Sequence, residues 1–453
     1  MTQSTGIAVG ARLREHVRGE VREPDDAGYD DARRVWNGAV DRRPAAVVRC
    51  LDEDDVRTAL LVAREHDVPL TVRGGGHDWA GRALTDGGVT LDLSAMRDVV
   101  VDRSRGVAHA LGGAHVSDVV EAAASHGLGT ATAVVRSVGM AGMTMAGGYG
   151  GLVGRFGLAA DNLVSADVVL ADGTRVKARP QENPELLWAL RGGGGNFGVV
   201  TSARYRLQPL GPVLGGMLLY PHAETAQVLR GYRDVLAAAP DELTVMAGLL
   251  TGPTGEPAVF VAPTWSGDLA AGEPVVAALS GLGTLVAGGV GPTPYAELLR
   301  MFDAGAAAGN RYALGTRWLP GLTDDAIDVL ADAAARFSSP GSLLALHHFH
   351  GAATRVAPDT TAFALRREHL LAEVIAGWRP GSSSGDAPHL AWVAEVGGAL
   401  APGALPGGYP NILGPQDADR ARLGFGANAA RLVAAKHRYD PDGVFTAIGA
   451  FPD

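Results

Sequence analysis

The chain has 453 residues, of which 47% are apolar, and a formal net charge of −10. This length can build two or three domains with buried cores, whereas the acidic balance argues against a nucleic-acid-binding surface, which leaves a basic footprint. No uncharged apolar stretch reaches membrane-spanning length, and the N-terminal residues show no secretory signal, so we expect a cytoplasmic protein with no membrane partner.

The first 210 residues alternate predicted strands and helices. Strands are predicted over 45–51, 69–74, 88–94 and 105–111, and helices over 52–68, 116–127 and 182–192. Residues 166–178 predict a hairpin that turns at Asp172-Gly173, and Asn183 is placed to cap the third helix. Cys50, the single cysteine, excludes an intramolecular disulfide and falls in a predicted strand, where we expect it to be a buried core residue.

The pattern changes after about Gly211, where strands mix with longer helices such as 323–337. Residues 343–353 predict a strand, 381–388 a loop, and the C-terminal segment a helix that stops at Asp440-Pro441. We predict an α+β protein in three parts. Residues 1–208 and 409–453 form a two-part binding domain, and residues 209–408 form a second domain between them.

Three glycine clusters lie in the first part: "RGGGH" at 73–77, a long cluster at 137–162 and "RGGGGNFG" at 191–198. Ordered glycines are entropically costly, and clusters of them present backbone N–H groups to phosphates. Three clusters in one domain favour a dinucleotide-sized ligand. Gly193, Gly195 and Gly198 match GxGxxG, but they follow a predicted helix rather than a strand, which argues against a Rossmann fingerprint.

Four segments resemble, in this order, the berberine bridge enzyme-like FAD-linked oxidases of the vanillyl-alcohol oxidase/p-cresol methylhydroxylase superfamily. They are "VRGGGHDWAG", "GGYGGLVGRFGLAADNLVSADVVLADG", "LLWALRGGGGNFGVVT" and "NAARLVAAKHRYDPDGVF". The resemblance extends from about Trp36 to Phe445 and is looser in the middle. It implies a two-part FAD-binding domain of the p-cresol methylhydroxylase type, with an inserted substrate domain made of an antiparallel sheet and helices.

By this resemblance the first glycine cluster wraps the FAD pyrophosphate. Gly74, Gly75 and Gly76 bring the backbone close to the phosphates, Arg73 supports the loop, and His77 is joined covalently to the flavin. A neutral imidazole is a suitable nucleophile near pH 7; the alternative is that His77 only caps the loop or bonds a phosphate. Further FAD-binding positions implied by the resemblance are Ser137, Val138, Gly139, Gly142, Gly147, Gly148, Gly150, Asp161, Asn162, Gly198, Val199, Val200, Asn411 and Asn428, the last with a helix cap as the alternative.

Two valines in the second cluster bear on the type of chemistry. Many members of the family carry a second flavin link, from a cysteine four residues before the glycine that matches Gly139. Val135 occupies this position, so we predict a single link through His77. By resemblance Val138 lies near the reactive edge of the flavin, and its small side chain favours dioxygen as the acceptor; the alternative is plain packing beside the flavin.

Histidines in the predicted strand 343–353 are candidate catalytic residues. Strand alternation places His348 and His350 on one face and His347 on the other. If the first pair faces the flavin, one of the two can take a hydroxyl proton; the alternative is a pair of structural histidines. No carboxylate or cysteine cluster accompanies them, so we predict no metal.

The segment "GGYPNIL" resembles a family motif in which Tyr409 and Asn411 match, while Ile412 replaces a tyrosine that is often catalytic. We therefore expect Tyr409, His348 or His350 to act as the base, with Asn411 beside it. Arg366, His369, Arg311 and Tyr312 are weaker candidates for the wall of the site.

The resemblance implies an FAD-dependent oxidase. It would take hydride from an alcohol, an amine-like group or another activated C–H of a small molecule such as a secondary metabolite, and pass the electrons to dioxygen. An oxygenase or dehydrogenase of the same fold, and a non-catalytic FAD-binding protein, are the alternatives.

Overall fold

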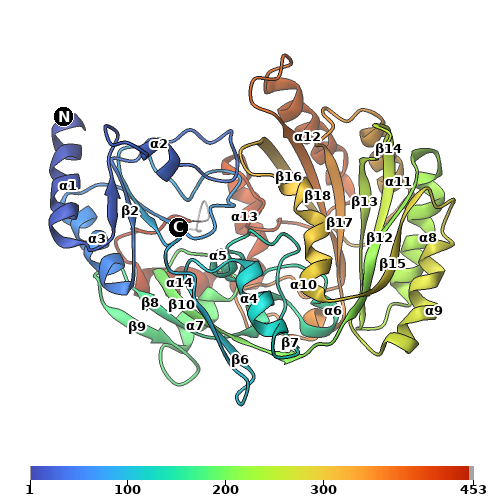
Figure 1. Ribbon diagram of the computed structural model, residues 1–453, viewed down its shortest axis with the longest axis horizontal. Helices are drawn as coiled ribbons and strands as arrows, with labels where there is room; N and C mark the ends of the chain where they lie inside the picture. The colour runs from blue at the N-terminus through green and yellow to red at the C-terminus, as the bar shows by residue number, and fades with distance from the viewer. Residues whose placement is uncertain (1, 448–453) are drawn as a thin grey trace.

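The computed structural model describes residues 2–447, whose strands form three main sheets (Figure 1). Two smaller sheets lie together in the first half of the chain, and a seven-stranded sheet lies at the other end of the molecule. The predicted α+β organisation is confirmed. The outermost positions of the predicted binding domain, residue 1 and residues 448–453, lie outside the described residues.

The first sheet has the order β1-β2-β4-β3. Its strands are β1 (Glu20–Arg22), β2 (Ala46–Arg49), β3 (Leu70–Arg73) and β4 (Val89–Asp92). β2 and β3 both pair in parallel with β4, since α3 (Glu53–Glu65) carries the chain back between β2 and β3. Asp52 caps α3 by accepting from the backbone N–H of Asp54 at 3.0 Å. Helix α1 (Thr2–His16) packs against α3 and was not predicted from the sequence.

The second sheet is antiparallel with the order β5-β6-β10-β8-β9. Its strands are β5 (Val99–Asp102), β6 (Val107–Leu111), β8 (Leu163–Val169), β9 (Arg175–Ala178) and β10 (Val199–Arg206). The predicted hairpin is β8–β9, and Gly173 in its turn has a φ of 80°. The helices of this region are α2 (Tyr29–Ala32), α4 (Val116–Ala124), α5 (Met140–Met145), α6 (Val153–Phe156) and α7 (Pro184–Leu190). Asn183 precedes α7 without a side-chain cap; its amide donates to the Lys177 carbonyl instead.

The third sheet is antiparallel with the order β15-β12-β14-β13-β17-β18-β16. Its strands are β12 (Val213–Pro221), β13 (Leu243–Thr251), β14 (Pro257–Trp265), β15 (Ala287–Thr293), β16 (Arg311–Leu319), β17 (Leu343–Phe349) and β18 (His369–Trp378). All of them fall within the segment assigned from the sequence to a second domain, whose exact boundaries stay a prediction.

Helices cover one face of this sheet. They are α8 (Thr225–Ala237), α9 (Leu269–Ser280), α11 (Asp324–Ala335) and α12 (Ala387–Ala399), and α10 (Tyr295–Leu298) is a short helix nearer α4. Leu249, Leu344, Leu346, Ala372 and Val374 pack under the covering helices. Because strand side chains alternate between faces, the intervening residues point away from these helices and toward the rest of the molecule.

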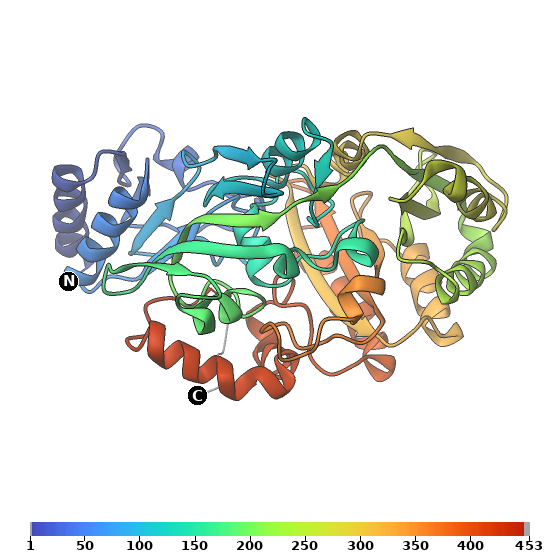
Figure 2. The ribbon, with the colours of Figure 1, turned by 90° about the horizontal axis from the view of Figure 1, so that it is seen from below.

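The end of the chain returns to the first half of the molecule. After α13 (Ala418–Gly424), helix α14 (Ala429–Tyr439) lies along the lower edge in Figure 2 and packs against α7. The Lys436 ammonium donates to the carbonyls of Asn196 (2.9 Å) and Phe445 (2.7 Å), and so ties the last residues to the third glycine cluster. No helix within residues 2–447 is long and apolar enough to cross a membrane.

Candidate active site

One large cavity lies where the glycine loops meet the uncovered face of the seven-stranded sheet. Its volume is about 770 Å³, within the range of small-molecule and cofactor sites. One wall comes from residues 74–78, 133–145, 194–200 and 445–447, and the other from β12, β13, β14, β16, β17 and β18. Segments far apart in the sequence therefore build a single site.

The first glycine loop follows β3 directly. Gly74, Gly75 and Gly76 line the cavity. A Cβ at Gly75 would lie 2.3 Å from the backbone nitrogen of Gly139, so the first and second clusters touch through their backbones. Gly76 has a φ of 67°, a conformation that favours glycine. The close backbone contact at Gly75 and the positive φ at Gly76 explain why glycine occupies these positions.

Arg73 supports this loop from behind rather than lining the cavity. Its guanidinium pairs with the buried Asp92 carboxylate (Nη2–Oδ2 2.6 Å). It also donates to the backbone carbonyls of Ala32 (2.5 Å) and Arg34 (3.0 Å). The end of β3 is thereby held to two other segments of the chain.

His77 presents its ring to the cavity. Its Nε2 lies 2.8 Å from the Ser137 Oγ, and its ring stacks on Trp36 with centroids 4.9 Å apart. Burial, followed by the nearby His115, lowers the pKa of His77 to about 4. The imidazole is therefore neutral at pH 7 and keeps a nitrogen lone pair, as a nucleophile requires.

The second cluster divides into a cavity-lining part and a packing part. Val138, Gly139 and Gly142 line the cavity. A Cβ at Gly142 would meet no atom within 4 Å, so the glycine leaves this space to a ligand. Val135, the position of the second flavin link in relatives, also lines the cavity and offers no sulfur, while Cys50 is buried in a separate core.

Three glycines expected at the cofactor do not line the cavity. A Cβ at Gly147 would lie 3.0 Å from the Phe363 ring, and one at Gly150 would lie 1.7 Å from the Thr132 carbonyl. The backbone N–H of Gly148 donates to the Tyr409 hydroxyl at 3.0 Å. These glycines allow close packing behind the site. They were predicted to contact the cofactor, and the structure places them in the packing layer instead.

The third cluster meets the cavity as expected. Gly198, Val199 and Val200 line it, at the start of β10, together with Gly194 and Gly195.

Asp161, Asn162 and Asn428 also lie away from the cavity. The Asn162 amide donates to the carbonyls of Phe156 and Leu158. The Asn428 amide donates to the carbonyl of Pro358 at 2.7 Å. Both asparagines hold loops by side-chain-to-backbone bonds, which are common structural uses of this residue.

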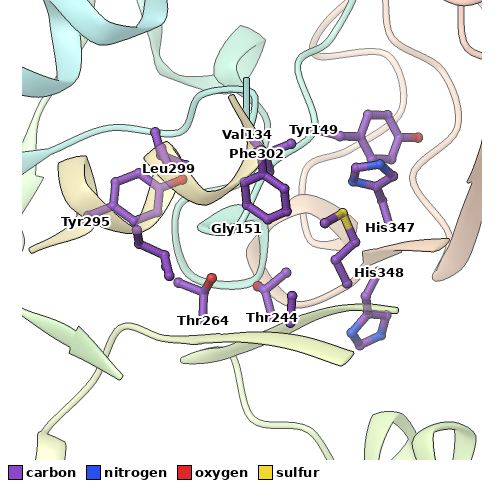
Figure 3. Close-up of a pocket in the computed structure, with 14 residues that line it drawn as sticks. Val134, Tyr149, Gly151, Thr244, Thr264, Tyr295, Leu299, Phe302, His347 and His348 are labelled. Atoms are coloured by element: carbon purple, nitrogen blue, oxygen red, sulfur yellow. The ribbon is translucent and has the colours of Figure 1, made fainter. Parts of the chain in front are cut away.

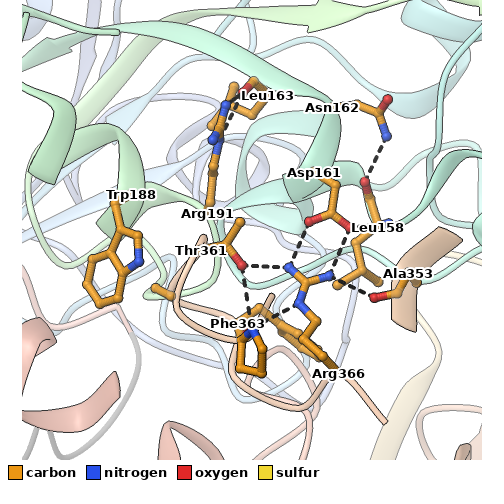
Figure 4. Close-up of polar contacts among 12 residues, drawn as sticks. Leu158, Asp161, Asn162, Leu163, Trp188, Arg191, Ala353, Thr361, Phe363 and Arg366 are labelled. Atoms are coloured by element: carbon orange, nitrogen blue, oxygen red, sulfur yellow. Dashed lines mark hydrogen bonds and ion pairs between the residues drawn. The ribbon is translucent and has the colours of Figure 1, made fainter. Parts of the chain in front are cut away.

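Asp161 forms a buried ion pair with Arg366 (Figure 4). The two distances are 2.7 Å and 2.9 Å, and the guanidinium also donates to the Ala353 carbonyl and Thr361 hydroxyl. Arg366 is thus a structural link and not part of the cavity wall. Of the other weak candidates, Tyr312 lines the cavity, whereas Arg311 pairs with Asp386 and His369 bonds the Tyr149 hydroxyl.

Tyr409 and Asn411 meet at the cavity. The Tyr409 hydroxyl accepts from the Asn411 amide (2.9 Å) and from the Gly148 N–H. Burial raises the pKa of Tyr409 to about 12. The phenol therefore keeps its proton at pH 7, which disfavours a role as base.

Of the three histidines at 347, 348 and 350, the one that faces the cavity is His347. It lies opposite Met246 in the sheet, and its Nε2 is 3.3 Å from Glu373 on β18. Ala345, directly opposite Glu373, shares the same face. Both side chains of the pair line the cavity and are largely buried.

His348 and His350 point to the opposite side of β17 and do not line the main cavity, so the structure does not place these two candidate bases at the site. Their rings stack with centroids 3.9 Å apart. Burial lowers the pKa of each to about 3. Figure 3 shows His347 and His348 on opposite sides of the strand. Alternation correctly grouped the histidines, but it could not decide which group faces the cavity.

A small chamber of about 20 Å³ adjoins the main cavity (Figure 3). The two share Val134, Tyr149, Met246, Phe302 and His347 as lining residues. This volume is enough for a single water molecule.

The residues present fit FAD. The cavity is of cofactor size, its floor consists of three touching glycine loops, and a neutral histidine stands at its edge. Within residues 2–447 no group of three or more His, Cys, Asp or Glu side chains is arranged to hold a metal ion.

Comparisons with known proteins agree with this site. Residues 44–179 match the family model described as "FAD binding domain", and residues 408–448 match the one described as "Berberine and berberine like". The (R)-6-hydroxynicotine oxidase of Paenarthrobacter nicotinovorans is 34% identical over 288 residues, which cover 63% of this chain and 63% of that protein. The match thus spans less than two thirds of that relative.

Two solved structures are similar over almost the whole chain. The 6-hydroxy-D-nicotine oxidase from Arthrobacter nicotinovorans is 28% identical, with a TM-score of 0.88 and coverage of 96% of this chain and 98% of that one. The glucooligosaccharide oxidase from Acremonium strictum, described with a 6-S-cysteinyl, 8α-N1-histidyl FAD, is 25% identical, with a TM-score of 0.82 and coverage of 96% and 97%.

Proposed function

We propose that this chain, which belongs to the berberine bridge enzyme-like FAD-linked oxidoreductases, is an oxidase whose flavin is attached covalently through His77 alone. The observation that carries the proposal is the placement of two functional groups around one cavity. His77 stands on the glycine loop, and the His347–Glu373 pair stands on the facing sheet.

The three glycine clusters would hold the cofactor. The glycines that line the floor of the cavity, where backbone N–H groups suit phosphates, are Gly74, Gly75, Gly76, Gly139, Gly142, Gly194, Gly195 and Gly198. When bound, FAD supplies the acceptor for a hydride and the centre that dioxygen reoxidises. Val138 lines the same wall, and its small side chain favours access for dioxygen.

His77 provides the nitrogen for the covalent link. Its neutral imidazole would replace one hydrogen of the 8α-methyl group of the flavin. One C–H and one N–H bond are lost, one C–N bond forms, and dioxygen is reduced to hydrogen peroxide. Val135 occupies the position of the cysteine that forms a second link in relatives, and the glucooligosaccharide oxidase gives a precedent for a histidyl FAD.

The His347–Glu373 pair would take the proton of the reacting O–H or N–H group. Both side chains face the cavity, and the imidazole lies next to the carboxylate, an arrangement that lets the pair accept and hold one proton. The Tyr409 hydroxyl, oriented by Asn411, donates a hydrogen bond to the bound substrate. Binding aligns the C–H bond of the substrate for hydride loss.

The experiment compares substitutions in the His347–Glu373 pair with a substitution of a histidine on the other face of β17. His347→Phe and Glu373→Gln are expected to slow anaerobic reduction of the flavin by about 10²- to 10⁴-fold, as loss of a general base does. His350→Phe is the matched control and is expected to stay within about threefold of the wild type. Equal losses in His347→Phe and His350→Phe would contradict the assignment.

The reaction type is read from the products. An oxidase gives one hydrogen peroxide for each substrate that loses two hydrogens. A product heavier by one oxygen atom would indicate an oxygenase, and turnover only with an added electron acceptor would indicate a dehydrogenase.

A further inference from the structure

The wall that the seven-stranded sheet gives to the cavity is mostly apolar. Met217, Met246 and Phe260 of the sheet line it, and Met301 and Phe302, from the short helical turn after α10, extend the same apolar lining. Thioether and aromatic side chains adapt to flat, hydrophobic ligands. This wall faces the glycine loops and is the surface against which a substrate would lie.

Few polar side chains interrupt this wall, and Thr251, at the end of β13, is one of them. The Tyr312 hydroxyl donates to the Ala307 carbonyl (2.7 Å), and the Ser342 hydroxyl is engaged with Ser338 and Ser339. The polar groups left for a ligand at the centre of the sheet are His347 and Glu373.

The His347–Glu373 pair has bonding capacity left over. His347 Nε2 is buried and makes no hydrogen bond within the described residues. Its distance to Glu373 is an ion-pair distance without hydrogen-bond geometry. A ligand that brings one N–H or O–H donor would satisfy the carboxylate.

A ligand with many hydroxyl groups does not fit this wall. Each hydroxyl that is buried against methionine, leucine or phenylalanine without a partner weakens binding by about fivefold to 150-fold. A sugar unit carries a hydroxyl on nearly every carbon, so its affinity would fall steeply on leaving water. An apolar ring or chain gains instead from the same contacts.

We infer that the substrate is a lipophilic alcohol or amine, with its O–H or N–H donor held at His347–Glu373 and an apolar body against the methionine- and phenylalanine-rich wall. An oligosaccharide, whose hydroxyl groups find few partners on this wall, is not the expected substrate. This inference rests on the proposed oxidase function and names the substrate class of the same site.

The test compares two ligand series on the flavin-loaded protein under anaerobic conditions. The first is benzyl alcohol, 2-phenylethanol, 3-phenylpropanol and 4-phenylbutanol with the corresponding amines. The second is glucose, cellobiose and cellotriose. The dissociation constant is measured from the change of the flavin absorption spectrum and, independently, by calorimetry. Each added methylene in the first series is expected to tighten binding by about fourfold.

A polar substitution in the wall tests the location. Met217→Gln keeps the length of the side chain and is expected to weaken binding of 4-phenylbutanol by about tenfold, with unchanged flavin content. Leu423→Gln, at an exposed position, is the control and is expected to have no effect. The alcohol and amine arms show which donor the pair prefers.

Three outcomes would overturn the inference. One is an affinity that does not change with chain length, another is tighter binding of cellobiose than of 4-phenylbutanol, and the third is binding of neither series. In each case a flavin that dithionite bleaches and air restores would leave the proposed oxidase standing. Protein without flavin would refute the proposed function itself.

Discussion

At the scale of single residues, the surroundings of His77 decide whether it can bond a cofactor. Trp36 fixes the plane of the imidazole by stacking, and the Ser137 hydroxyl holds Nε2 at 2.8 Å. The hydrogen bond at one ring nitrogen sets which tautomer the ring adopts. In the tautomer whose Nε2–H donates to the Ser137 hydroxyl, Nδ1 keeps the lone pair that can form a bond.

Removal of the Ser137 hydroxyl should therefore impair attachment of the flavin. Ser137→Ala is expected to lower the fraction of covalently bound flavin by about threefold or more, since the loss of such a bond is worth about 1 kcal/mol, and Ser137→Thr should restore it. The measurement is flavin fluorescence of the denatured protein band. Full attachment in Ser137→Ala would show that the hydroxyl has no part in orienting His77.

The stacked pair His348 and His350 leads to a second prediction at the scale of residues, which concerns how the free energy of unfolding depends on pH. Unfolded histidines have a pKa of about 6.5, whereas burial lowers the pKa of both in the folded chain to about 3. Between these values the unfolded chain binds protons that the folded chain does not. The contribution of the uncharged pair to the free energy of unfolding is thus fully present above about pH 6.5 and is lost as the pH falls. The titratable and charged groups beside the pair are Glu368, Asp241, Arg355 and His369.

His348→Phe tests this linkage. The variant is expected to reduce the slope of the unfolding free energy against pH by about 1 kcal/mol per pH unit between pH 5.5 and 4. Urea unfolding at a series of pH values gives the slope, and His126→Phe, at an exposed position, is the control. A slope unchanged by His348→Phe would mean that His348 does not titrate with folding.

At the scale of elements, strands β17 and β18 place one set of side chains in the core under the helices and the other set on the cavity. Period-two alternation puts Leu344, Leu346 and Val374 under the helices and Ala345, His347 and Glu373 on the cavity. A shift of one residue in either strand would exchange these faces. The register Ala345↔Glu373 therefore fixes which histidine belongs to the site.

The connection between these strands is anchored by the buried Arg366–Asp161 pair (Figure 4). Arg366→Met leaves the carboxylate buried without its partner and is expected to lower the free energy of unfolding by about 3–5 kcal/mol. The matched control is Arg355→Met, which breaks the exposed pair with Asp241 and is expected to cost less than about 1 kcal/mol. Denaturant titration measures both, and similar losses in the two variants would contradict the role given to Arg366.

At the scale of the whole molecule, three distant segments close one cavity. The glycine loops come from the first 200 residues, the apolar wall from the seven-stranded sheet, and residues 445–447 from the C-terminal return. The part of the cavity wall between the glycine loops and the sheet includes Tyr409, Asn411 and Ile412. A site of this kind exists only when both parts of the chain are folded against each other.

The sequence predicted the fold class and the first glycine loop well, because strand alternation, Asp-Gly turns and the "RGGGH" motif are local signals. The glycines at 147, 148 and 150 were misplaced, since a glycine required for packing looks the same in sequence as one required for a ligand. His347 and Glu373 were not identified as a pair. They lie 26 residues apart, and only the register of β17 with β18 brings them to one face.

The covalent flavin on His77 is the central claim, and one measurement tests it most directly. The purified protein is precipitated in acid, and the flavin in the pellet is compared for wild type, His77→Ala and the exposed control His126→Ala. We predict yellow pellets for the wild type and His126→Ala and a colourless pellet for a folded His77→Ala variant. Flavin that leaves the wild-type pellet, or stays with His77→Ala, would contradict the account.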